Sequence, residues 1–382
     1  MHPFTPQPLP LTEIAWEPLI PLIGKANRSI AQYDGVLYGV PNPEVLLSPL
    51  TTQEAVLSSR IEGTQATLGE VLKFEAGEQP NQESKRLDIQ EILNYRIALR
   101  AAETELKTRP FSLNLLLKIH EILLDSVRGR NMGRGRFRMT QNWVGAHGSP
   151  IEEAFFVPPE PSRLPEYLDN WEKYYHANRP DQLVQLAIVH AQFEIIHPFL
   201  DGNGRLGRIL IPLFLYEKEL LHRPMFYLSS WIEENREAYV SLLRALGKAE
   251  NSWNRWIEFF LKGVDEQARK NAEKARSIMD LYERMKQKVI DITHSQFAVP
   301  LLDQIFERPL FQSSHLLFQG LNISRPSVAN LLAALKEAEI LRVIRQGAGR
   351  RPTVYVFPEL LNLCEGREVF SEPSSSVSRE SA

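Results

Sequence analysis

The stretch Ile196–Arg208, IHPFLDGNGRLGR, holds the residues best suited to chemistry. His197 is a candidate general base, and Asp201 is a candidate carboxylate ligand of a divalent cation. The Asp-Gly-Asn-Gly run can form a tight loop with positive φ angles, which opens onto a helix starting near Arg205. Bare amides at a helix N-terminus bind anions, and Arg205 and Arg208 lie one turn apart on that helix. Together these groups describe a phosphoryl- or nucleotidyl-transfer site.

Pro198, which follows His197, determines the backbone conformation that we expect for the histidine. Proline disfavours the α region for the residue before it, so we predict that His197 lies in an extended junction after a helix ending at Ile196. Taken singly, each part has an ordinary explanation: a buried histidine, a surface turn, a solvated helix face. Their conjunction within thirteen residues favours a functional site.

The same stretch resembles the Fic signature, HPFx(D/E)GN(G/K)RxxR, at every specified position. The helical surroundings fit the Fic core over residues 111–262. Fic proteins mostly transfer AMP from ATP to a hydroxyl side chain of a target protein. The resemblance implies that this chain is a protein adenylyltransferase, a nucleotidyltransferase that uses ATP with Mg²⁺, or with Mn²⁺ in its place.

The resemblance also implies roles for individual residues. His197 is the expected general base for the incoming hydroxyl, Asp201 the expected Mg²⁺ ligand, and Arg208 the expected partner of the γ-phosphate. The other expected ATP-binding residues of the motif are Gly202, Asn203, Gly204, Arg205, Leu206 and Gly207. Asn235 and Tyr239 resemble the family's adenosine-side residues, although core packing explains Tyr239 equally well.

A second motif lies far upstream. Residues 58–63, SSRIEG, fit the (S/T)xxxE(G/N) pattern of the Fic inhibitory helix, which we expect over about 51–76 with Thr51 or Thr52 as N-cap. Ser58 and Glu62 are four residues apart and therefore share a helix face. A glutamate aimed at Arg208 would form a bidentate pair and take the place of the γ-phosphate. The alternative is a solvated helical glutamate.

The elements around these motifs are mainly helical. Apolar periodicity and capping signals predict helices over 85–107, 113–127 (capped by Ser112), 164–176, 183–196, 205–220, 233–246 and 253–286. Two β-rich stretches, Gln141–Val144 and Ala154–Val157, predict a hairpin, in which the resemblance places the flap that docks an extended target segment. The arginines at 128, 130, 134, 136 and 138 are expected to support the flap rather than bind nucleic acid. His120, His190 and His222 are expected to be structural.

The C-terminal part predicts a winged helix-turn-helix domain. The helices are expected over 301–306, 313–319 and 326–337, and the two-stranded wing over 340–345 and 353–357. Arg342, Arg345, Arg350 and Arg351 make the wing basic, which suits DNA phosphates or, equally, a protein interface. The expected domains are 1–110, N-terminal and helical; 111–262, the Fic core; 263–296, a linking helix; 297–360, the winged helix; and 361–382, a tail with a disordered end.

Composition narrows the class of protein. The 382 residues carry 44 Lys and Arg against 47 Asp and Glu, a net charge of −3, which excludes a chain that is basic throughout. Cys364 is the single cysteine, so an intramolecular disulfide is excluded and a reducing compartment is favoured. The longest apolar run, Ile209–Tyr216, is too short to span a bilayer. We therefore expect a cytoplasmic protein without a membrane partner.

The sequence leaves several points open. The target protein, its acceptor (Ser, Thr or Tyr, with self-modification included), DNA binding and a homodimer are not decided. One alternative function is a winged-helix regulator whose Fic domain senses nucleotide. Another is an enzyme that also removes AMP from the target, with Glu62 positioning a water.

Overall fold

A computed structural model describes residues 2–126, 132–145, 150–316, 323–349 and 351–369. The chain divides into two compact units, of which the first contains residues 1–39, 54–67 and 80–273 and the second contains 40–53, 68–79 and 274–382. The helices of the first unit are α1 (Ile20–Gly39), α5 (Glu83–Leu106), α6 (Leu113–Leu123), α7 (Leu164–His176), α8 (Gln182–Ile196), α9 (Asn203–Glu217), α10 (Ser229–Glu234) and α11 (Arg236–Ala245). Two helices continue from one unit into the other: α3 (Ser48–Ile61) and α12 (Ser252–Thr293). The mainly helical fold class is confirmed.

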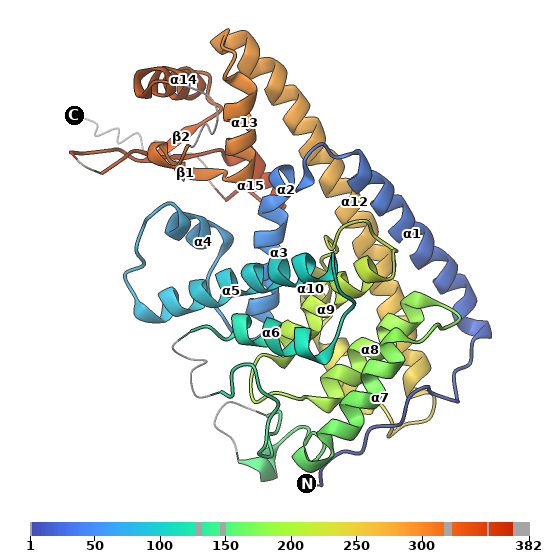
Figure 1. Ribbon diagram of the computed structural model, residues 1–382. Coiled ribbons are helices and arrows are strands. Elements are labelled where there is room, and N and C mark those ends of the chain that lie inside the picture. Colours follow the sequence, from blue (N-terminus) through green and yellow to red (C-terminus); the bar gives the residue numbers. More distant parts are fainter. Residues whose placement is uncertain (1, 127–131, 146–149, 317–322, 350, 370–382) are drawn as a thin grey trace, which may run out of the picture. The chain divides into compact units, whose positions relative to one another are not determined.

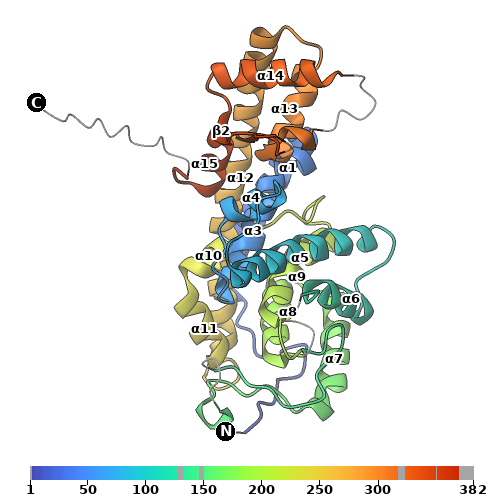
Figure 2. The same ribbon diagram turned by 90° about the vertical axis from the view of Figure 1, so that its left-hand side faces the viewer.

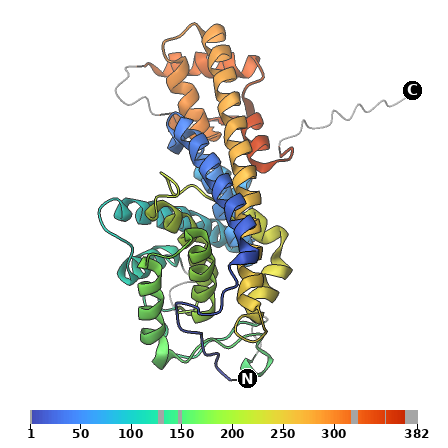
Figure 3. The same cartoon turned by 90° about the vertical axis from the view of Figure 1, so that its right-hand side faces the viewer.

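Helices α8 and α9 form the centre of the first unit. In α8 the side chains are buried on every face except at Gln182 and Glu194, and α9 is buried along most of its length. A helix that is apolar all round belongs inside a core, since it has no face suited to water. Both α7 and α9 pack against α8, and Figure 3 shows α7 and α8 side by side in green. The loop between α8 and α9 is therefore held between two largely buried helices.

The surrounding helices support this centre. Helices α5 and α6 run together, and α5 also contacts α9 (Figure 2). The cap predicted for α6 is confirmed, because the Ser112 hydroxyl accepts a hydrogen bond from the amide of Leu115. Helix α1 lies along the first half of α12 (Figure 1), where the Ser29 hydroxyl donates to the Asp265 carboxylate at 2.6 Å.

The second unit contains a small antiparallel sheet. Its strands are β1 (Leu310–Gln312), β2 (Arg342–Arg345) and β3 (Val354–Val356), in the order β1-β3-β2. Val356 pairs with Leu310 on one side and with Arg342 on the other. The helices of this unit are α2 (Pro43–Leu46), α4 (Leu68–Glu75), α13 (Ala298–Glu307), α14 (Arg325–Glu337) and α15 (Pro358–Glu365). Helix α2 packs on α13, and α4 packs on β1.

The C-terminal expectations are only partly matched. Helices α13 and α14 and the wing strands β2 and β3 occur where they were predicted, but β1 and α15 were missed. The helix predicted at 313–319 is only a 3₁₀ turn at Ser313–His315, and residues 317–322 lie outside the described part. Helix α15 extends into the predicted tail, whose end, 370–382, also lies outside it. The predicted boundaries at 110, 262 and 296 stay a prediction, since the two units are discontinuous in sequence.

Several local predictions were wrong. Helix α3 begins at Ser48 instead of being capped at 51 or 52, and it ends at Ile61, so the predicted helix over 51–76 is broken by residues 62–67. The helix predicted at 233–246 is split at Asn235 into α10 and α11. The predicted hairpin contains a single backbone bridge, between Val144 and Phe156, and residues 146–149 at its tip are outside the described part. We keep the word flap for residues 141–145 and 150–157.

None of the helices in the described residues combines the length and the apolar character that crossing a bilayer requires.

Candidate active site

The backbone of His197 differs from the prediction. Helix α8 ends at Ile196, and His197 follows as its C-cap in the left-handed region, with φ +49° and ψ +58°. The His197 amide still donates to the Phe193 carbonyl at 3.0 Å, so the turn completes the helix instead of leaving it as an extended strand. A non-glycine residue in this region is strained, and such strain persists where the surroundings over-determine it.

The His197 ring is fixed as a base. Nδ1 lies 3.2 Å from the carbonyl of Glu194, and a carbonyl can only accept, so Nδ1 carries the hydrogen and Nε2 the lone pair. Burial lowers the pKa of His197 to about 4, and the nearby Arg138 guanidinium adds to this effect. The imidazole is therefore neutral at pH 7 and able to take a proton through Nε2.

Arg138, which belongs to the arginine run noted in the sequence, binds the backbone of His197. Its Nε donates to the His197 carbonyl at 2.9 Å, and its Nη2 donates to the Pro159 carbonyl. Its side chain is buried, as expected for a structural arginine. Arg134 instead donates to Asp125 at 2.8 Å, and the arginines at 128 and 130 lie outside the described residues.

The loop after His197 is closed by two side chains. The Asn203 amide bonds the backbone of Phe199 twice, accepting from its N–H at 2.9 Å and donating to its carbonyl at 2.8 Å. His120, on α6, lies 3.1 Å from the Asp201 carbonyl through Nε2, and its ring stacks on Phe199 at 3.8 Å. Burial lowers the pKa of His120 to about 4, so this ring is neutral. His120 is structural as expected, and its place is directly under the motif.

Asp201 lies at the mouth of this loop. Its Oδ1 accepts from the Gly202 amide at 2.6 Å and lies 3.6 Å from Nη2 of Arg205, and its side chain is 43% exposed. Among the described residues, no three His, Cys, Asp or Glu side chains gather closely enough to hold a metal ion between them. One exposed carboxylate fits Mg²⁺ bound together with a nucleotide, because that ion keeps waters and phosphate oxygens as its other ligands.

The first turn of α9 forms the floor of the site. Gly202 precedes it with φ +80°, and the amides of residues 203–205 have no acceptor within the helix. The Leu206 amide already donates to the Gly202 carbonyl, and its side chain is fully buried. Arg205 is 4% exposed and donates to Glu91 of α5 at 3.0 Å. The groups able to bind an anion are thus the first three amides and the arginines.

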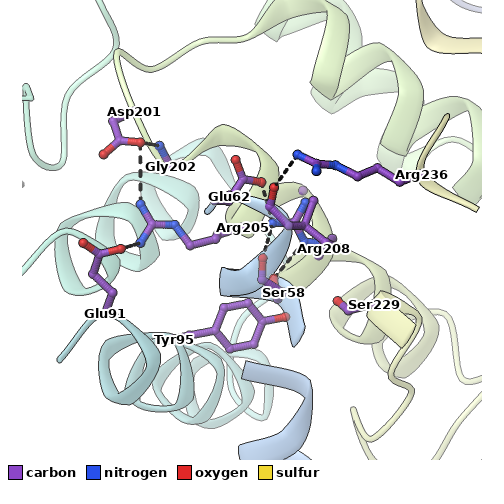
Figure 4. Close-up of polar contacts among 12 residues, drawn as sticks. Ser58, Glu62, Glu91, Tyr95, Asp201, Gly202, Arg205, Arg208, Ser229 and Arg236 are labelled. Carbon is purple, nitrogen blue, oxygen red and sulfur yellow. Dashed lines mark hydrogen bonds and ion pairs between the residues drawn. The ribbon is translucent and has the colours of Figure 1, made fainter. Parts of the chain in front are cut away.

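Glu62, the first residue after α3, brings its carboxylate to Arg208 (Figure 4). The guanidinium donates from Nη2 to Oε1 of Glu62 at 2.6 Å, and it donates to both the hydroxyl and the carbonyl of Ser58 at 2.8 Å. The predicted pair is present, but it joins a single Glu62 oxygen to Nη2, while Ser58 accepts from Nε and also from Nη2. Burial alone would raise the pKa of Glu62, yet the Arg208 guanidinium outweighs it and the pKa lies below its ordinary value.

The Glu62 carboxylate also fills the space above the α9 N-terminus. A Cβ added at Gly204 would lie 2.2 Å from Oε1 of Glu62 and 3.0 Å from Nη1 of Arg208. A side chain at this position would have to displace the Glu62 carboxylate, whereas glycine leaves it room. Glu62 thus occupies the position that the sequence assigns to phosphate.

Further contacts fix the end of α3. Arg236 of α11 donates to the carbonyl of Ile61 at 3.0 Å (Figure 4). The buried carboxylate of Glu54 accepts from the Ser229 hydroxyl at 2.5 Å and from the Tyr95 hydroxyl at 3.4 Å. Burial raises the pKa of Glu54 to about 7. The sequence analysis did not identify this group, and its only signal was that Glu54, Ser58 and Glu62 recur every four residues.

A second unexpected carboxylate lies beside the motif. Oε1 of Glu194 is buried without a hydrogen-bond partner, and it lies 2.2 Å from a Cβ added at Gly207. Burial raises the pKa of Glu194 to about 7. Gly207 therefore contributes space for this side chain.

The predicted adenosine-side residues are engaged with the protein. The Asn235 amide donates to the Trp231 carbonyl, and the buried Tyr239 hydroxyl lies 2.9 Å from Nε2 of His190. These contacts favour the packing role for Tyr239, and the adenosine role stays a prediction. His222 is engaged as well, with Nδ1 lying 2.7 Å from Asp34.

The comparisons with known proteins agree with this geometry. Residues 20–104 match the model of the Fic/DOC family N-terminal domain, and residues 110–215 match that of the Fic/DOC family. A probable protein adenylyltransferase from Aquifex aeolicus is 30% identical over 210 residues, which are 53% of this chain and 56% of that protein. The protein adenylyltransferase Fic of Drosophila grimshawi is 30% identical over 132 residues, 33% of this chain and 24% of that protein.

Solved structures show the same fold. A Fic family protein from Desulfovibrio desulfuricans aligns with a TM-score of 0.57 at 21% identity, covering 92% of this chain and 98% of that one. A Fic-domain signalling protein from Bacteroides thetaiotaomicron aligns with a TM-score of 0.51 at 16% identity, covering 66% of this chain and 97% of that one.

Proposed function

The chain belongs to the Fic/DOC family, and on this premise we propose that it is a protein adenylyltransferase, which transfers AMP from ATP to a hydroxyl side chain of a target protein. The observation that carries the proposal is the single turn between α8 and α9. It places a neutral histidine, whose Nε2 carries the lone pair, beside two arginines and three amides that have no acceptor within α9.

The residues of the site have separate roles in the proposed reaction. The amides of 203–205 and the Arg205 guanidinium bind the α- and β-phosphates, and Arg208 binds the γ-phosphate. Nε2 of His197 takes the proton of the target hydroxyl while its oxygen attacks the α-phosphorus. The new O–P bond forms, the bond to the β-phosphate oxygen breaks, and pyrophosphate leaves. Mg²⁺ held by Asp201 would supply charge neutralisation of the phosphates.

We include autoinhibition in the proposal. Glu62 occupies the space above Gly204 and engages Arg208, so a γ-phosphate has neither room nor partner there while α3 stays in place. ATP would then bind without its α-phosphate aligned for attack, and lost alignment alone can cost several kcal/mol of barrier.

The test uses the full chain carrying Glu62→Gly, with Mg²⁺, a cell lysate and ATP labelled at either the α- or the γ-phosphate. His197→Ala in the same background is the control, and its label is subtracted because kinases of the lysate also transfer the γ-phosphate. We expect the remaining label to come from α-labelled ATP only, and mass spectrometry to find the mass of AMP on a Ser, Thr or Tyr. Label above the control from γ-labelled ATP, or none from either while ATP still binds, would refute adenylyl transfer.

The same experiment addresses the two alternatives from the sequence. Loss of label from modified protein in the presence of wild-type chain, but not of its Glu62→Gly form, would support AMP removal. Nucleotide binding without any label would support the regulator. The DNA contacts of such a regulator would involve the wing formed by β2 and β3. In this wing Arg345 already lies 3.5 Å from Glu78, and Arg350 is outside the described residues.

A further inference from the structure

The N-terminal residues 4–15, which we call the strap, form no helix or strand and were given no role by the sequence. They are nevertheless bound to the first unit at several points. Asn170 of α7 accepts from the Leu9 amide and donates to the Leu9 carbonyl, both at 2.8 Å. Asn254 of α12 likewise accepts from the Ala15 amide at 3.1 Å and donates to the Ala15 carbonyl at 2.7 Å. Two side-chain amides thus satisfy the strap backbone as a neighbouring strand would.

Two residues before the first of these anchors, the strap contacts α8. Gln192, five residues before His197 on α8, donates to the Gln7 carbonyl at 2.8 Å. The indole N–H of Trp253 donates to the side-chain carbonyl of Gln7. The path of the strap is therefore fixed against the same helix that carries the base.

Beyond Gln7 the strap meets the flap. The amide of Phe4 donates to the carbonyl of Val157 at 2.9 Å, and the Phe4 ring lies 5.6 Å from the ring of Phe156. The Lys248 amino group lies over both rings, at 5.6 and 5.7 Å. Because backbone groups of an extended chain point alternately to opposite sides, Val157 faces the strap while Phe156 faces Val144. The strap and residue 144 thus flank the segment 154–157 on opposite edges.

The other side of the flap leads back to the motif. The amide of Val144 donates to the carbonyl of Phe156 at 2.8 Å, and the Asn142 side-chain amide donates to the carbonyl of Phe199, two residues after His197. A two-stranded ribbon is marginally stable in water, and this one has a single bridge. Its position relative to His197 therefore depends on what holds its outer edge.

We propose that the strap is a positioning element of the transfer reaction. By pairing with Val157 and packing on Phe156, it fixes the flap in the position at which the backbone of the target binds. This inference rests on the proposed function. It predicts that loosening the strap impairs use of the protein acceptor without impairing ATP binding.

The test compares four changes in the Glu62→Gly background. Phe4→Ala removes the ring, Phe4→Pro also removes the N–H, Phe4→Tyr retains both, and Thr12→Ala is the control at an exposed strap residue. We measure the self-modification rate, the KM for ATP, and hydrogen exchange of flap peptides.

We expect Phe4→Ala to slow self-modification about fivefold, since an aromatic pair contributes about 0.5–1.5 kcal/mol, a factor of about 2 to 13. Phe4→Pro should slow it further, while Phe4→Tyr and Thr12→Ala leave it unchanged. The KM for ATP should stay constant, and peptides covering 142–144 and 154–157 should exchange faster, with α8 and α9 unaffected.

Other results would overturn the proposal. Unchanged exchange in the flap would show that the strap does not fix it, and faster exchange with an unchanged rate would show that fixing it does not position the acceptor. A general fall in melting temperature with exchange rising in α8 would indicate a merely structural role. If the Glu62→Gly parent transfers no AMP while the exchange results hold, the proposed function fails and the flap contact stands.

Discussion

Releasing Arg208 from Glu62 tests the link between two motifs that lie 146 residues apart. Hydrogen bonds to charged groups contribute about 1.5–3 kcal/mol. Glu62 is 38% exposed, so water competes for its carboxylate and the lower end of that range applies, whereas Arg208 is 2% exposed. About 1.4 kcal/mol corresponds to a factor of ten, so Glu62→Gly should increase transfer at least about tenfold.

The assay is the initial rate of self-modification with α-labelled ATP for wild type, Glu62→Gly, Arg208→Ala and the double variant. The gain should be lost when Arg208 is also removed, because the freed arginine is the group that binds the γ-phosphate. The two changes should therefore be strongly non-additive. Melting curves of all four proteins establish that each is folded.

The neighbouring serines provide a matched pair of controls. Ser58→Ala removes one of the bonds that occupy Arg208 and should raise transfer by less than Glu62→Gly does. Ser59→Ala removes an equally buried hydroxyl that lacks a hydrogen-bond partner, and it should change nothing. The reasoning is refuted if folded Glu62→Gly is no faster than wild type, or if its gain survives the loss of Arg208.

Three further predictions concern protons. His197→Ala should lower transfer by about 10²–10⁴-fold with ATP affinity by calorimetry unchanged; comparable turnover would remove His197 from the mechanism. Because the pKa of His197 is lowered to about 4, NMR of labelled histidines, assigned by that variant, should show its ring neutral at pH 6; a titration near 6.5 would contradict the burial argument. The pKa of Glu54 is raised to about 7, so between its ordinary pKa and pH 7 the folded state binds more protons than the unfolded state, and stability falls as pH rises. Glu54→Gln should flatten the pH dependence of the unfolding free energy between pH 5 and 8, and an unchanged slope would assign it to other groups.

The site is predictable where its chemistry is local. A helix, a glycine-containing loop and a second helix are specified by residues within thirteen positions, so the base, the loop and the anion-binding turn follow from the stretch 196–208. The Ser112 cap follows for the same reason, since it acts on a residue only three positions away. The backbone of His197 was predicted wrongly because the rule for residues before proline describes the isolated dipeptide, whereas closing the last turn of α8 decides it here.

The partners of these residues were decided by tertiary structure. The sequence shows which face of a helix is apolar, but not which helix it meets. Nothing near Arg205 points to Glu91, and nothing near His197 identifies Arg138 as its support. The strap shows the same limit most clearly, since an extended segment without periodicity acquires its bonds only from Asn170 and its other distant partners.

The sequence by itself determined the mainly helical class, the loop of residues 197–202 and, through a resemblance, the pairing of Glu62 with Arg208. Tertiary structure decided that one carboxylate oxygen makes this pair while Ser58 accepts from Nε and Nη2, that Glu54 and Arg236 hold α3 in its middle and at its end, and that the flap has one bridge. The physical reason is range. Capping, turn geometry and helical periodicity act over about four residues, whereas burial and charge pairing depend on contacts that the chain forms only once it is packed.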